Sequence, residues 1–453
     1  MIRAWWGVGL SVFLALACAR EKPVTVAVIG DYGGDTPEEA QVAALVAGFA
    51  PDLVFTTGDN NYPNGAADTI DANIGKHYAR FIAPYRGAFG PGASENRFFP
   101  SLGNHDWKGK AGAQPYLDYF ELPGNERYYD VRRGPVHLFV VDSDPHEPDG
   151  ITRDSKQALW LRDSLAKSDA PHRWVTLHHP PYSSGPHGST AELQWPFRAW
   201  GATAVFAGHD HDFERFDVGG MPYVVVGTGG MRLYPILLPL PGSVARVETH
   251  GALRIEATSD SARAEFLAVG GGARDSFELP ASTELPAPVS LVAAGSSWKL
   301  MDGVTPREGW RDAGFDSSAW PVAAAPFRIV DRGAASGAKA RTTYYRIEFQ
   351  VTGPESLAAL ELGLPRDQPA VAYLNGREVA RVARAPARER KWLVARGPRG
   401  AGTDAPILTH SLLDPRQLMA GPNALAIEIR REPGSGGDSS FDAALVAYPR
   451  TVP

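Results

Sequence analysis

The chain has 453 residues, which is too long for one ordinary domain and predicts two or three. A hydrophobic content of 43% is typical of a globular protein, and the abundance of glycine (48) and proline (38) favours many short strands and loops over a helical bundle. The net charge of -6 and the scattered lysines and arginines give no support to a nucleic-acid-binding role, so no nucleic-acid partner is expected.

Residues 1–22 have the features of an export signal. Arg3 is followed by an apolar stretch at 4–17 that is too short to span a bilayer and ends in small residues. Two interpretations of Cys18, the single cysteine, stay open: a lipid-attachment cysteine like those of bacterial lipoproteins, or a neighbour of an ordinary cleavage site. We expect an exported protein of the periplasm, cell envelope or extracellular space, with a lipid anchor at Cys18 under the first interpretation. One cysteine allows no intrachain disulfide.

Residues 23–278 alternate apolar runs with helix-like stretches. The runs are typical of buried strands, and the helix-like stretches have apolar residues at helical spacing. This alternation predicts an α/β domain whose sheet is covered on both faces and binds ligands beyond the carboxyl ends of its strands. The expected strands are 24–30, 52–59, 137–144, 174–179, 202–209 and 222–230, and the expected helices are 37–49 and 155–168.

The character of the chain changes after a proline-rich stretch at 279–290, which predicts a linker. Short alternating runs with glycine and proline turns then predict an all-β, jelly-roll-like sandwich over residues 291–453. Asn375-Gly376 is typical of a tight hairpin. Three tryptophans of this region are expected in the core, while a glycan contact by the domain is left open; they are Trp298, Trp310 and Trp320.

Polar clusters follow five of the expected apolar runs. Each cluster alone has an ordinary explanation as a turn or a helix cap, but five of them at one sheet edge favour a joint role. Carboxylate and amide oxygens with imidazoles suit Mn, Fe or Zn, and a carboxylate between two cations can bridge them. The side chains offered as ligands are Asp31, Asp59, Tyr62, Asn104, His178, His209 and His211. Because residues two apart in an extended chain point the same way, His209 and His211 are expected side by side.

In this order the clusters resemble the calcineurin-like metallophosphoesterases, and among them the purple acid phosphatases. The resemblance spans about residues 24–230 and is carried by GDYGG, GDNNY, GNHDW, HHPPYSSGPHG and GHDHDFERF. Tyr62 is its distinguishing mark, because most of the wider superfamily lacks a ligating tyrosine there. The resemblance implies a four-layer α-β-β-α domain. Residues 302–327 and 373–381 resemble galactose-binding-like domains attached to bacterial hydrolases.

The resemblance also implies roles for individual residues in a dinuclear metal centre. Fe(III) would be bound by Asp31, Tyr62 and His211; a divalent Fe, Zn or Mn would be bound by Asn104, His178 and His209; and Asp59 would bridge both. His105 corresponds to the histidine that protonates the leaving oxygen, and His187 to a substrate-side histidine. Asp106 is expected to orient His105 by hydrogen bonding, and the side chain of His179 is expected to point away from that of His178.

The implied reaction is hydrolysis of a small phosphomonoester, with metal-bound hydroxide as the nucleophile and His105 as the general acid. Two alternatives remain open at this point. A phosphodiesterase or nucleotide-processing enzyme would use the same metal frame, and a cell-surface carbohydrate-binding protein would carry an inactive enzyme domain. Against the second alternative, every expected ligand position is filled.

Overall fold

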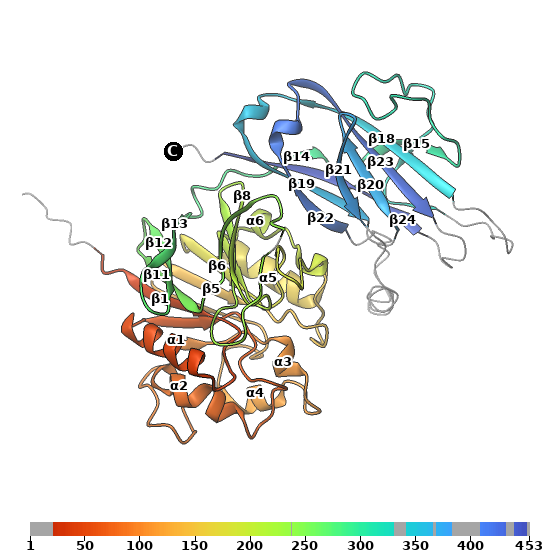
Figure 1. Cartoon of the computed structure of the whole chain (residues 1–453). Coiled ribbons are helices and arrows are strands. Elements are labelled where there is room, and N and C mark those ends of the chain that lie inside the picture. The colour runs from red at the N-terminus through yellow and green to blue at the C-terminus, as the bar shows by residue number, and fades with distance from the viewer. Residues whose placement is uncertain are drawn as a thin grey trace, which may run out of the picture.

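The computed structural model describes residues 21–236, 238–329, 341–365, 368–382, 408–431 and 439–450. The chain forms an N-terminal domain of helices and strands and a C-terminal domain built from strands (Figure 1). Cys18 and nearly all of the expected export signal lie outside the described residues. Within the described part, none of the helices has the length and apolar character needed to cross a membrane.

The N-terminal domain contains two sheets rather than the single sheet that the sequence pattern predicts. A six-stranded sheet has the order β13 (Ala273–Leu279), β12 (Ala262–Ala268), β11 (Gly251–Ala257), β1 (Val24–Ile29), β2 (Leu53–Thr56) and β3 (Phe98–Phe99). A seven-stranded sheet has the order β10 (Ser243–Val247), β8 (Phe213–Val218), β9 (Met221–Val226), β7 (Ala204–Ala207), β6 (His172–Thr176), β5 (Val136–Val140) and β4 (Tyr129–Arg133). In the first sheet β1, β2 and β3 are parallel, and in the second β5, β6, β7 and β9 are parallel.

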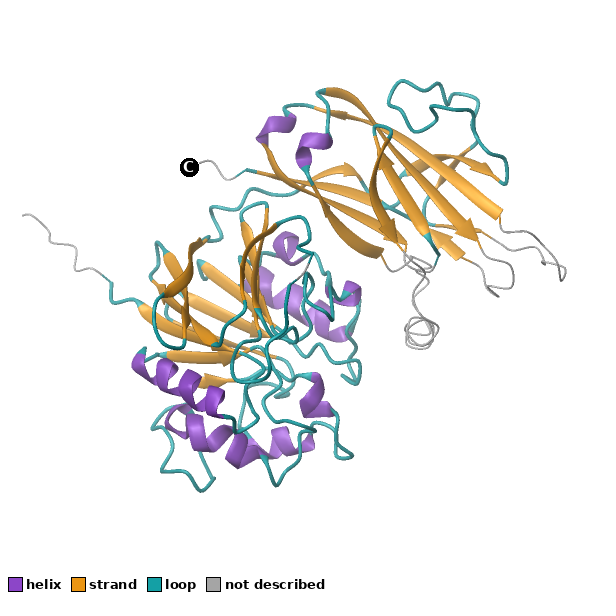
Figure 2. Cartoon of the chain, viewed as in Figure 1, coloured by secondary structure: helices purple, strands orange, loops and turns teal. Residues whose placement is uncertain are grey.

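The two sheets pack face to face, and helices cover their outer faces (Figure 2). One apolar cluster joins strands of both sheets, from Val28 and Phe55 to Trp174 and Phe206, all of them buried. This is the four-layer α-β-β-α arrangement, so the implied fold is confirmed. The single sheet covered on both faces was wrong because a buried apolar run does not reveal which of two stacked sheets it joins.

The two longest helices match their predicted positions and begin at side-chain caps. α1 (Pro37–Gly48) starts after Thr36, whose hydroxyl accepts the Glu39 N–H, and α5 (Lys156–Lys167) starts after Ser155, whose hydroxyl accepts the Ala158 N–H. The shorter elements are α2 (Lys76–Tyr78), α3 (Asn104–Trp107), α4 (Gln114–Tyr119), α6 (Phe197–Trp200), a π turn η1 (Asp71–Gly75) and the 3-10 turns η2 (Ala79–Phe81) and η3 (Ala191–Leu193).

The C-terminal domain is the predicted all-β sandwich. Its four-stranded sheet has the order β14 (Val289–Val292), β25 (Ala444–Pro449), β19 (Leu357–Pro365) and β22 (Leu408–Leu413). Its six-stranded sheet has the order β16 (Val322–Ala324), β15 (Ser297–Asp302), β18 (Arg341–Val351), β23 (Gly421–Arg431), β20 (Ala370–Leu374) and β21 (Arg377–Val382). A short pair joins β17 (Phe327–Ile329) to β24 (Ser439–Phe441), and two 3-10 turns, η4 (Pro354–Ser356) and η5 (Pro415–Gln417), complete the domain.

Local details of the sandwich agree with the sequence. Asn375 and Gly376 join β20 to β21 and both have positive φ, which is the backbone that a tight primed turn requires. Trp298 is fully buried in the core between the sheets, while Trp310 and Trp320 pack together in a separate buried cluster. The core interpretation of these tryptophans is confirmed, and their rings are not displayed as a surface platform.

Candidate metal centre

The seven side chains that the sequence offers as ligands converge at one edge of the N-terminal domain. The carboxyl ends of the parallel strands of both sheets meet there, so residues that follow different strands become neighbours. In chain order they are Asp31 after β1, Asp59 and Tyr62 after β2, Asn104 after β3, His178 after β6, and His209 and His211 after β7.

The first group of donor atoms consists of Asp31, Tyr62, His211 and one oxygen of Asp59. The Tyr62 hydroxyl lies 2.8 Å from Asp59 Oδ2, 3.3 Å from Asp31 Oδ1 and 3.3 Å from His211 Nε2. His211 Nε2 lies 3.4 Å from Asp31 Oδ1. These are the separations expected between donor atoms that could share one cation. All four side chains are buried, so the donor atoms face one another in a space sheltered from solvent.

The second group consists of Asn104, His178, His209 and the other oxygen of Asp59. His178 Nε2 is 2.9 Å from Asn104 Oδ1, 3.2 Å from His209 Nδ1 and 3.4 Å from Asp59 Oδ1. Asp59 therefore presents Oδ2 to the first group and Oδ1 to the second. This carboxylate is the one side chain common to both groups, which is the position that a bridging ligand requires.

Backbone contacts orient the histidines for metal binding. His178 Nδ1 donates to the Thr57 carbonyl at 2.9 Å, and His211 Nδ1 donates to the Arg232 carbonyl at 2.7 Å. In each ring the opposite nitrogen, Nε2, faces the donor group. A ligating histidine is commonly held in this way by a hydrogen bond from its other ring nitrogen.

The backbone of three ligands is also specialised. Asp31, Asp59 and His209 have φ values of 55°, 56° and 72°, in the left-handed region that residues other than glycine seldom adopt. Such conformations cost on the order of 1–3 kcal/mol each and gather at functional sites. The loops also approach closely: a Cβ on Gly208 would lie 2.5 Å from Asp31 Oδ2, and one on Gly103 would lie 2.3 Å from the Asp59 backbone nitrogen.

The electrostatics of the two groups favour bound cations. Burial and the charges of Asp31 and Asp59 hold the pKa of Tyr62 well above its usual value. Burial and the neighbouring histidines lower the pKa of His209 far below its usual value, so it is a neutral imidazole able to ligate. Cations among these groups would stabilise both carboxylates and an ionised phenol. The donor set of oxygen and imidazole nitrogen fits Fe, Zn or Mn.

His105 lies on the solvent side of the donor groups. Its Nδ1 is 2.7 Å from the Pro63 carbonyl oxygen, to which it donates, and its ring centroid lies 4.2 Å from that of Tyr62 with the planes tilted by 38°. His105 Nε2 lies 4.0 Å from Asp59 Oδ2. With Nδ1 occupied by this carbonyl, Nε2 is the ring nitrogen left to face the cavity.

Asp106 does not have the position expected for orienting His105. Its carboxylate accepts the Gly103 N–H at 2.8 Å and the Asn60 side-chain amide at 2.9 Å. Burial and the nearby charge of Asp59 raise the pKa of Asp106 to about 7. Asp106 therefore joins the loops after β2 and β3, while the Pro63 carbonyl orients His105. The expectation was wrong because neighbours on the short α3 turn point to different sides.

The GHDH segment divides its side chains among three tasks. His209 and His211 were expected side by side, but the positive φ of His209 breaks the extended chain, and the two imidazoles join different donor groups. Asp210 points to the other side and is fully buried. Its carboxylate accepts the Ser183 hydroxyl at 2.5 Å and the His187 backbone N–H at 3.0 Å, and it contacts His187 Nδ1 at 3.0 Å. Asp210, which the sequence analysis missed, thus holds His187 in place.

His179 also departs from expectation. It was expected to point away from His178, but its ring centroid lies 4.9 Å from that of His178 and 4.5 Å from that of His209. The ligand atoms of these three histidines all lie within 4.8 Å of one another. Burial and the charge of His178 lower the pKa of His179 to about 3, so it is neutral. His179 Nδ1 is 3.0 Å from the Ser143 hydroxyl, which fixes the ring beside the second group.

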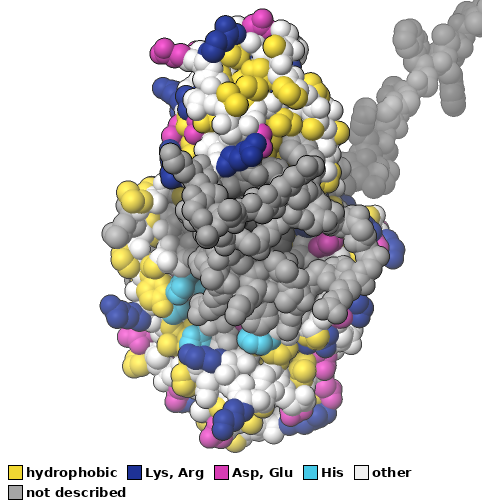
Figure 3. Space-filling model, turned by 90° about the vertical axis from the view of Figure 1, so that its right-hand side faces the viewer, with side chains coloured by type: hydrophobic (Ala, Val, Ile, Leu, Met, Phe, Trp, Pro, Cys, Tyr) yellow, Lys and Arg dark blue, Asp and Glu magenta, His cyan; other side chains and the backbone are white. Residues whose placement is uncertain are grey.

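A cavity of about 330 Å³ opens above the two groups. Three residues that follow β9 belong to its wall, and the sequence analysis did not select them: Met231, Arg232 and Tyr234. Tyr234 stacks on His211 with ring centroids 4.3 Å apart, and the Arg232 side chain is exposed. The rule that ligands bind beyond strand ends would have found them. Histidine side chains reach the surface on the lower part of the molecule in Figure 3, which is the N-terminal domain. The remaining wall residues are Asp59, Tyr62, Asn104, His105, His187, His209 and His211.

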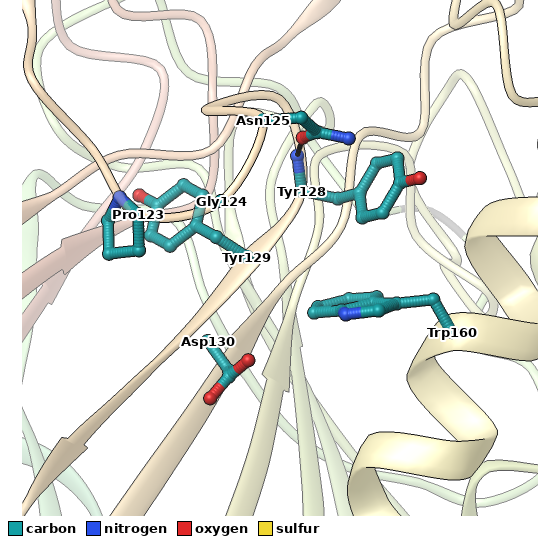
Figure 4. Close-up of a pocket in the computed structure, with 7 residues that line it drawn as sticks. All are labelled: Pro123, Gly124, Asn125, Tyr128, Tyr129, Asp130 and Trp160. Carbon is teal, nitrogen blue, oxygen red and sulfur yellow. Dashed lines mark hydrogen bonds between the residues drawn. The ribbon is translucent and has the colours of Figure 1, made fainter.

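A second hollow, of about 260 Å³, lies between β4 and α5 (Figure 4). Trp160 and Tyr128 form an aromatic wall with ring centroids 5.0 Å apart. Its polar side chains have partners: Asp130 contacts His137, the Tyr128 hydroxyl donates to Asp149, and Asn125 Oδ1 accepts the Tyr128 backbone N–H. No convergent donor set faces this hollow among the described residues, so the cavity above the donor groups is the candidate site.

Comparisons with known proteins agree with this geometry. Residues 24–213 match the family model of the calcineurin-like phosphoesterases. Rat tartrate-resistant acid phosphatase type 5 is 26% identical over 253 residues, which is 48% of this chain and 75% of the rat protein. Purple acid phosphatase 17 of Arabidopsis thaliana is 28% identical over 236 residues, which is 46% of this chain and 68% of the plant protein.

Solved structures resemble the same part of the chain at lower similarity. The purple acid phosphatase PPD1 from yellow lupin seeds has a TM-score of 0.48 and 19% identity, covering 58% of this chain and 54% of the lupin chain. GAP50 of Plasmodium, described as an anchor in the inner membrane complex, has a TM-score of 0.47 and 17% identity, covering 58% of this chain and 90% of its own.

Proposed function

We propose that the protein hydrolyses phosphomonoesters at a dinuclear metal centre, because residues 24–213 match the calcineurin-like phosphoesterase model and the similar proteins include tartrate-resistant and purple acid phosphatases. The observation that carries the proposal is the sharing of Asp59 between two compact donor groups. Its Oδ2 contacts Tyr62 and its Oδ1 faces His178. Two cations held beside one carboxylate can clamp a phosphate between them.

The residues of each group match the requirements of different ions. Asp31, Tyr62 and His211 would hold Fe(III), because a phenolate and a carboxylate suit a hard trivalent ion. Asn104, His178 and His209 would hold a divalent Fe, Zn or Mn. When bound, such cations acidify a water molecule and neutralise charge on phosphoryl oxygens.

His105 is proposed as the proton donor to the leaving group. Its Nδ1 is committed to the Pro63 carbonyl, so a proton on Nε2 is directed toward the cavity. General acid catalysis of this kind contributes roughly 10²–10⁴-fold. Asp106 is a positioning residue in this proposal, since it holds the loop that carries His105.

The cavity wall also fits an anionic substrate. Arg232 is exposed at the wall, and within the described part of the chain no carboxylate pairs with it. His187 lies on the same wall, with its ring 4.2 Å from that of His209. We assign Arg232 and His187 to contact the phosphate or its organic group. A monoester dianion gains more from the guanidinium of Arg232 than a diester monoanion does.

The proposed location is outside the cytoplasm. The N-terminal stretch with the features of an export signal supports this proposal, with Cys18 as a lipid-attachment point under one interpretation of the signal. The tartrate-resistant and purple acid phosphatases that the chain resembles support the acid phosphatase role.

The test combines metal analysis, visible spectroscopy and initial rates on the purified full chain. We expect about two metal ions per chain, one of them iron, and a visible band that is lost in Tyr62→Phe while the fold stays intact. Initial rates on p-nitrophenyl phosphate should exceed those on bis-p-nitrophenyl phosphate. A preference for the diester would replace the proposal with the phosphodiesterase alternative, and a protein that binds no metal and turns over neither compound would refute it.

A further inference from the structure

The segment that presents His187 is held on its far side by the C-terminal sandwich. This segment, residues 180–190, is called the histidine loop here, and it begins directly after His178 and His179. Tyr182 of the loop is buried and packs on Phe216 and Tyr223 of the N-terminal domain. The same apolar cluster includes side chains of the sandwich, namely Ala359, Leu412 and Tyr448.

A partly buried carboxylate of the sandwich, with 12% of its side chain exposed, lies beside this contact. Glu361 on β19 forms an ion pair with His410 Nδ1 at 2.5 Å and accepts the Tyr448 hydroxyl. Tyr182 belongs to the same apolar cluster as Tyr448, and burial together with the charge of Glu361 raises the pKa of the Tyr182 hydroxyl. Burial alone would raise the pKa of Glu361, but His410 and the neighbouring hydroxyls outweigh burial and hold it below its usual value. Glu361 therefore joins β19 to His410 of β22 and to Tyr448 of β25 beside the contact with Tyr182.

Gln194 makes a second connection between the histidine loop and the sandwich. Its Nε2 donates to the Pro181 carbonyl at 3.0 Å and to the His410 carbonyl at 3.1 Å. Its Oε1 accepts the His410 backbone N–H at 2.7 Å. A single amide side chain thus joins the start of the loop to β22. Consecutive loop residues, Pro181 and Tyr182, are linked to the sandwich through different partners.

The opposite side of the histidine loop is held by the metal centre. Asp210 accepts hydrogen bonds from the Ser183 hydroxyl and the His187 backbone N–H, and Glu214 accepts the Ser184 N–H at 2.7 Å. The loop therefore lies between two sets of contacts, one from the GHDH segment and β8 and one from the sandwich. Loss of either set of contacts would leave the loop that carries His187 held on one side.

We propose that the C-terminal sandwich is a structural part of the catalytic unit, and that Gln194 and Tyr182 are positioning residues that set the histidine loop against the cavity. None of the residues that line the cavity belongs to the sandwich among the described part of the chain, so the effect is transmitted through the loop. The kinetic part of this inference rests on the proposed phosphatase function, while its structural part does not.

The test uses the full chain with Gln194→Ala and Tyr182→Ala, which remove the amide link and the packed ring, and Tyr223→Phe as the matched control. Tyr223 lies in the same interface, with its ring centroid 5.0 Å from that of Tyr182, and the control removes only its hydroxyl. Amide hydrogen exchange should become faster in residues 180–190 of both test variants and stay at the wild-type rate in the control. The KM for p-nitrophenyl phosphate should rise roughly three- to tenfold in the test variants. Their metal content should be unchanged, and their kcat should stay close to the wild-type value.

Two results would overturn the inference. Wild-type exchange over residues 180–190 in both test variants would show that the sandwich does not hold the loop. Equal acceleration in Tyr223→Phe would show general loosening of the interface instead of a specific connection. If the wild-type protein proves to have no phosphatase activity, the proposed function fails, and hydrogen exchange still decides this inference.

Discussion

The role of a single cavity residue depends on which of its polar atoms has no partner within the protein and faces the cavity. His105 is the clearest case, because one ring nitrogen is occupied by the Pro63 carbonyl and the other faces the cavity. Within the described part of the chain no side chain lies at hydrogen-bond distance from that second nitrogen, and Oδ2 of Asp59 is 4.0 Å away. A group held in this way suits proton transfer, and its contribution depends on how much the leaving group needs the proton.

We expect His105→Ala to lower kcat on an alkyl phosphate by about 10²–10⁴-fold, because the alkoxide leaves poorly without a proton. On p-nitrophenyl phosphate, whose leaving group is already a stable anion, the loss should be less than about tenfold. Parallel steady-state measurements on both substrates check this. Equal losses would remove His105 from the role of proton donor.

Glu39, which lies outside both donor groups, permits a test of how burial of a carboxyl group makes stability depend on pH. Its Oε2 accepts the Gly34 and Asp35 backbone N–H groups beside the Asp31 loop. Burial raises the pKa of Glu39 from 4.5 to about 9, so the folded chain keeps a proton that the unfolded chain releases. Wild-type stability is therefore undiminished by Glu39 below the unfolded pKa of 4.5 and declines as the pH rises toward about 9.

Glu39→Gln keeps a neutral side chain with an oxygen for the same two N–H groups at every pH. We expect the variant and the wild type to have similar Tm values near pH 4.5, and the variant to be more stable at pH 8, by up to ~1.4 kcal/mol for each pH unit. Thermal unfolding of both proteins across this range measures the difference. A difference that does not change with pH would mean that Glu39 is ionised in the folded protein.

At the scale of elements, the GHDH segment contacts both donor groups and the histidine loop. Its histidines enter the two donor groups, and Asp210 between them holds the histidine loop. The chain leaves β7 with a positive φ at His209, and this turn lets three neighbouring side chains reach three different places. That backbone turns consecutive side chains in directions that an extended strand could not provide.

Asp210→Asn should separate loop placement from metal binding. An amide can accept the His187 N–H but cannot accept every bond that the carboxylate accepts, so we expect KM to rise roughly three- to tenfold with metal content unchanged. The control is Asp217→Asn on β8, where the carboxylate accepts only the Gly220 N–H among the described residues. Loss of metal in Asp210→Asn would show that Asp210 supports the ligands directly.

Much of the element pattern could be predicted from the sequence, and the failures have local causes. α1 and α5 were found because their apolar residues recur at helical spacing, and the structure adds the caps at Thr36 and Ser155. The ligand set was found because each member follows an apolar run that ends at a strand terminus. Asp210 and Arg232 were missed, since their roles depend on a loop and a wall that only the folded chain brings beside them. The division into two sheets was likewise hidden, because strand pairing between distant segments leaves no local pattern.

For the whole molecule, metal loading should govern the stability of the N-terminal domain. Without cations, two buried carboxylates lie close together, each in contact with the Tyr62 hydroxyl. Ions that bind only the folded chain stabilise it by mass action, about 4 kcal/mol when their concentration is a thousand times Kd.

We expect removal of metal by a chelator to lower the Tm of the full chain by several degrees, and readdition of Zn or Mn to restore most of it. Differential scanning calorimetry of the loaded, stripped and reloaded protein checks this. In a matched Asp31→Asn variant, chelation should have a smaller effect, since the first donor group is already impaired. A stripped wild type as stable as the loaded form would mean that the donor groups hold no ion.

The left-handed backbone of Asp31 and Asp59 has a consequence for mutagenesis and for the natural variation that these positions can accept. Asparagine tolerates that conformation almost as well as aspartate, whereas alanine does not. Replacement by alanine therefore disturbs the path of the chain and the chemistry together, while asparagine removes only the charge. Sequences that drift from aspartate to asparagine at these places would keep the architecture intact and lose the catalyst, which is a short route from an enzyme to a folded protein of another use.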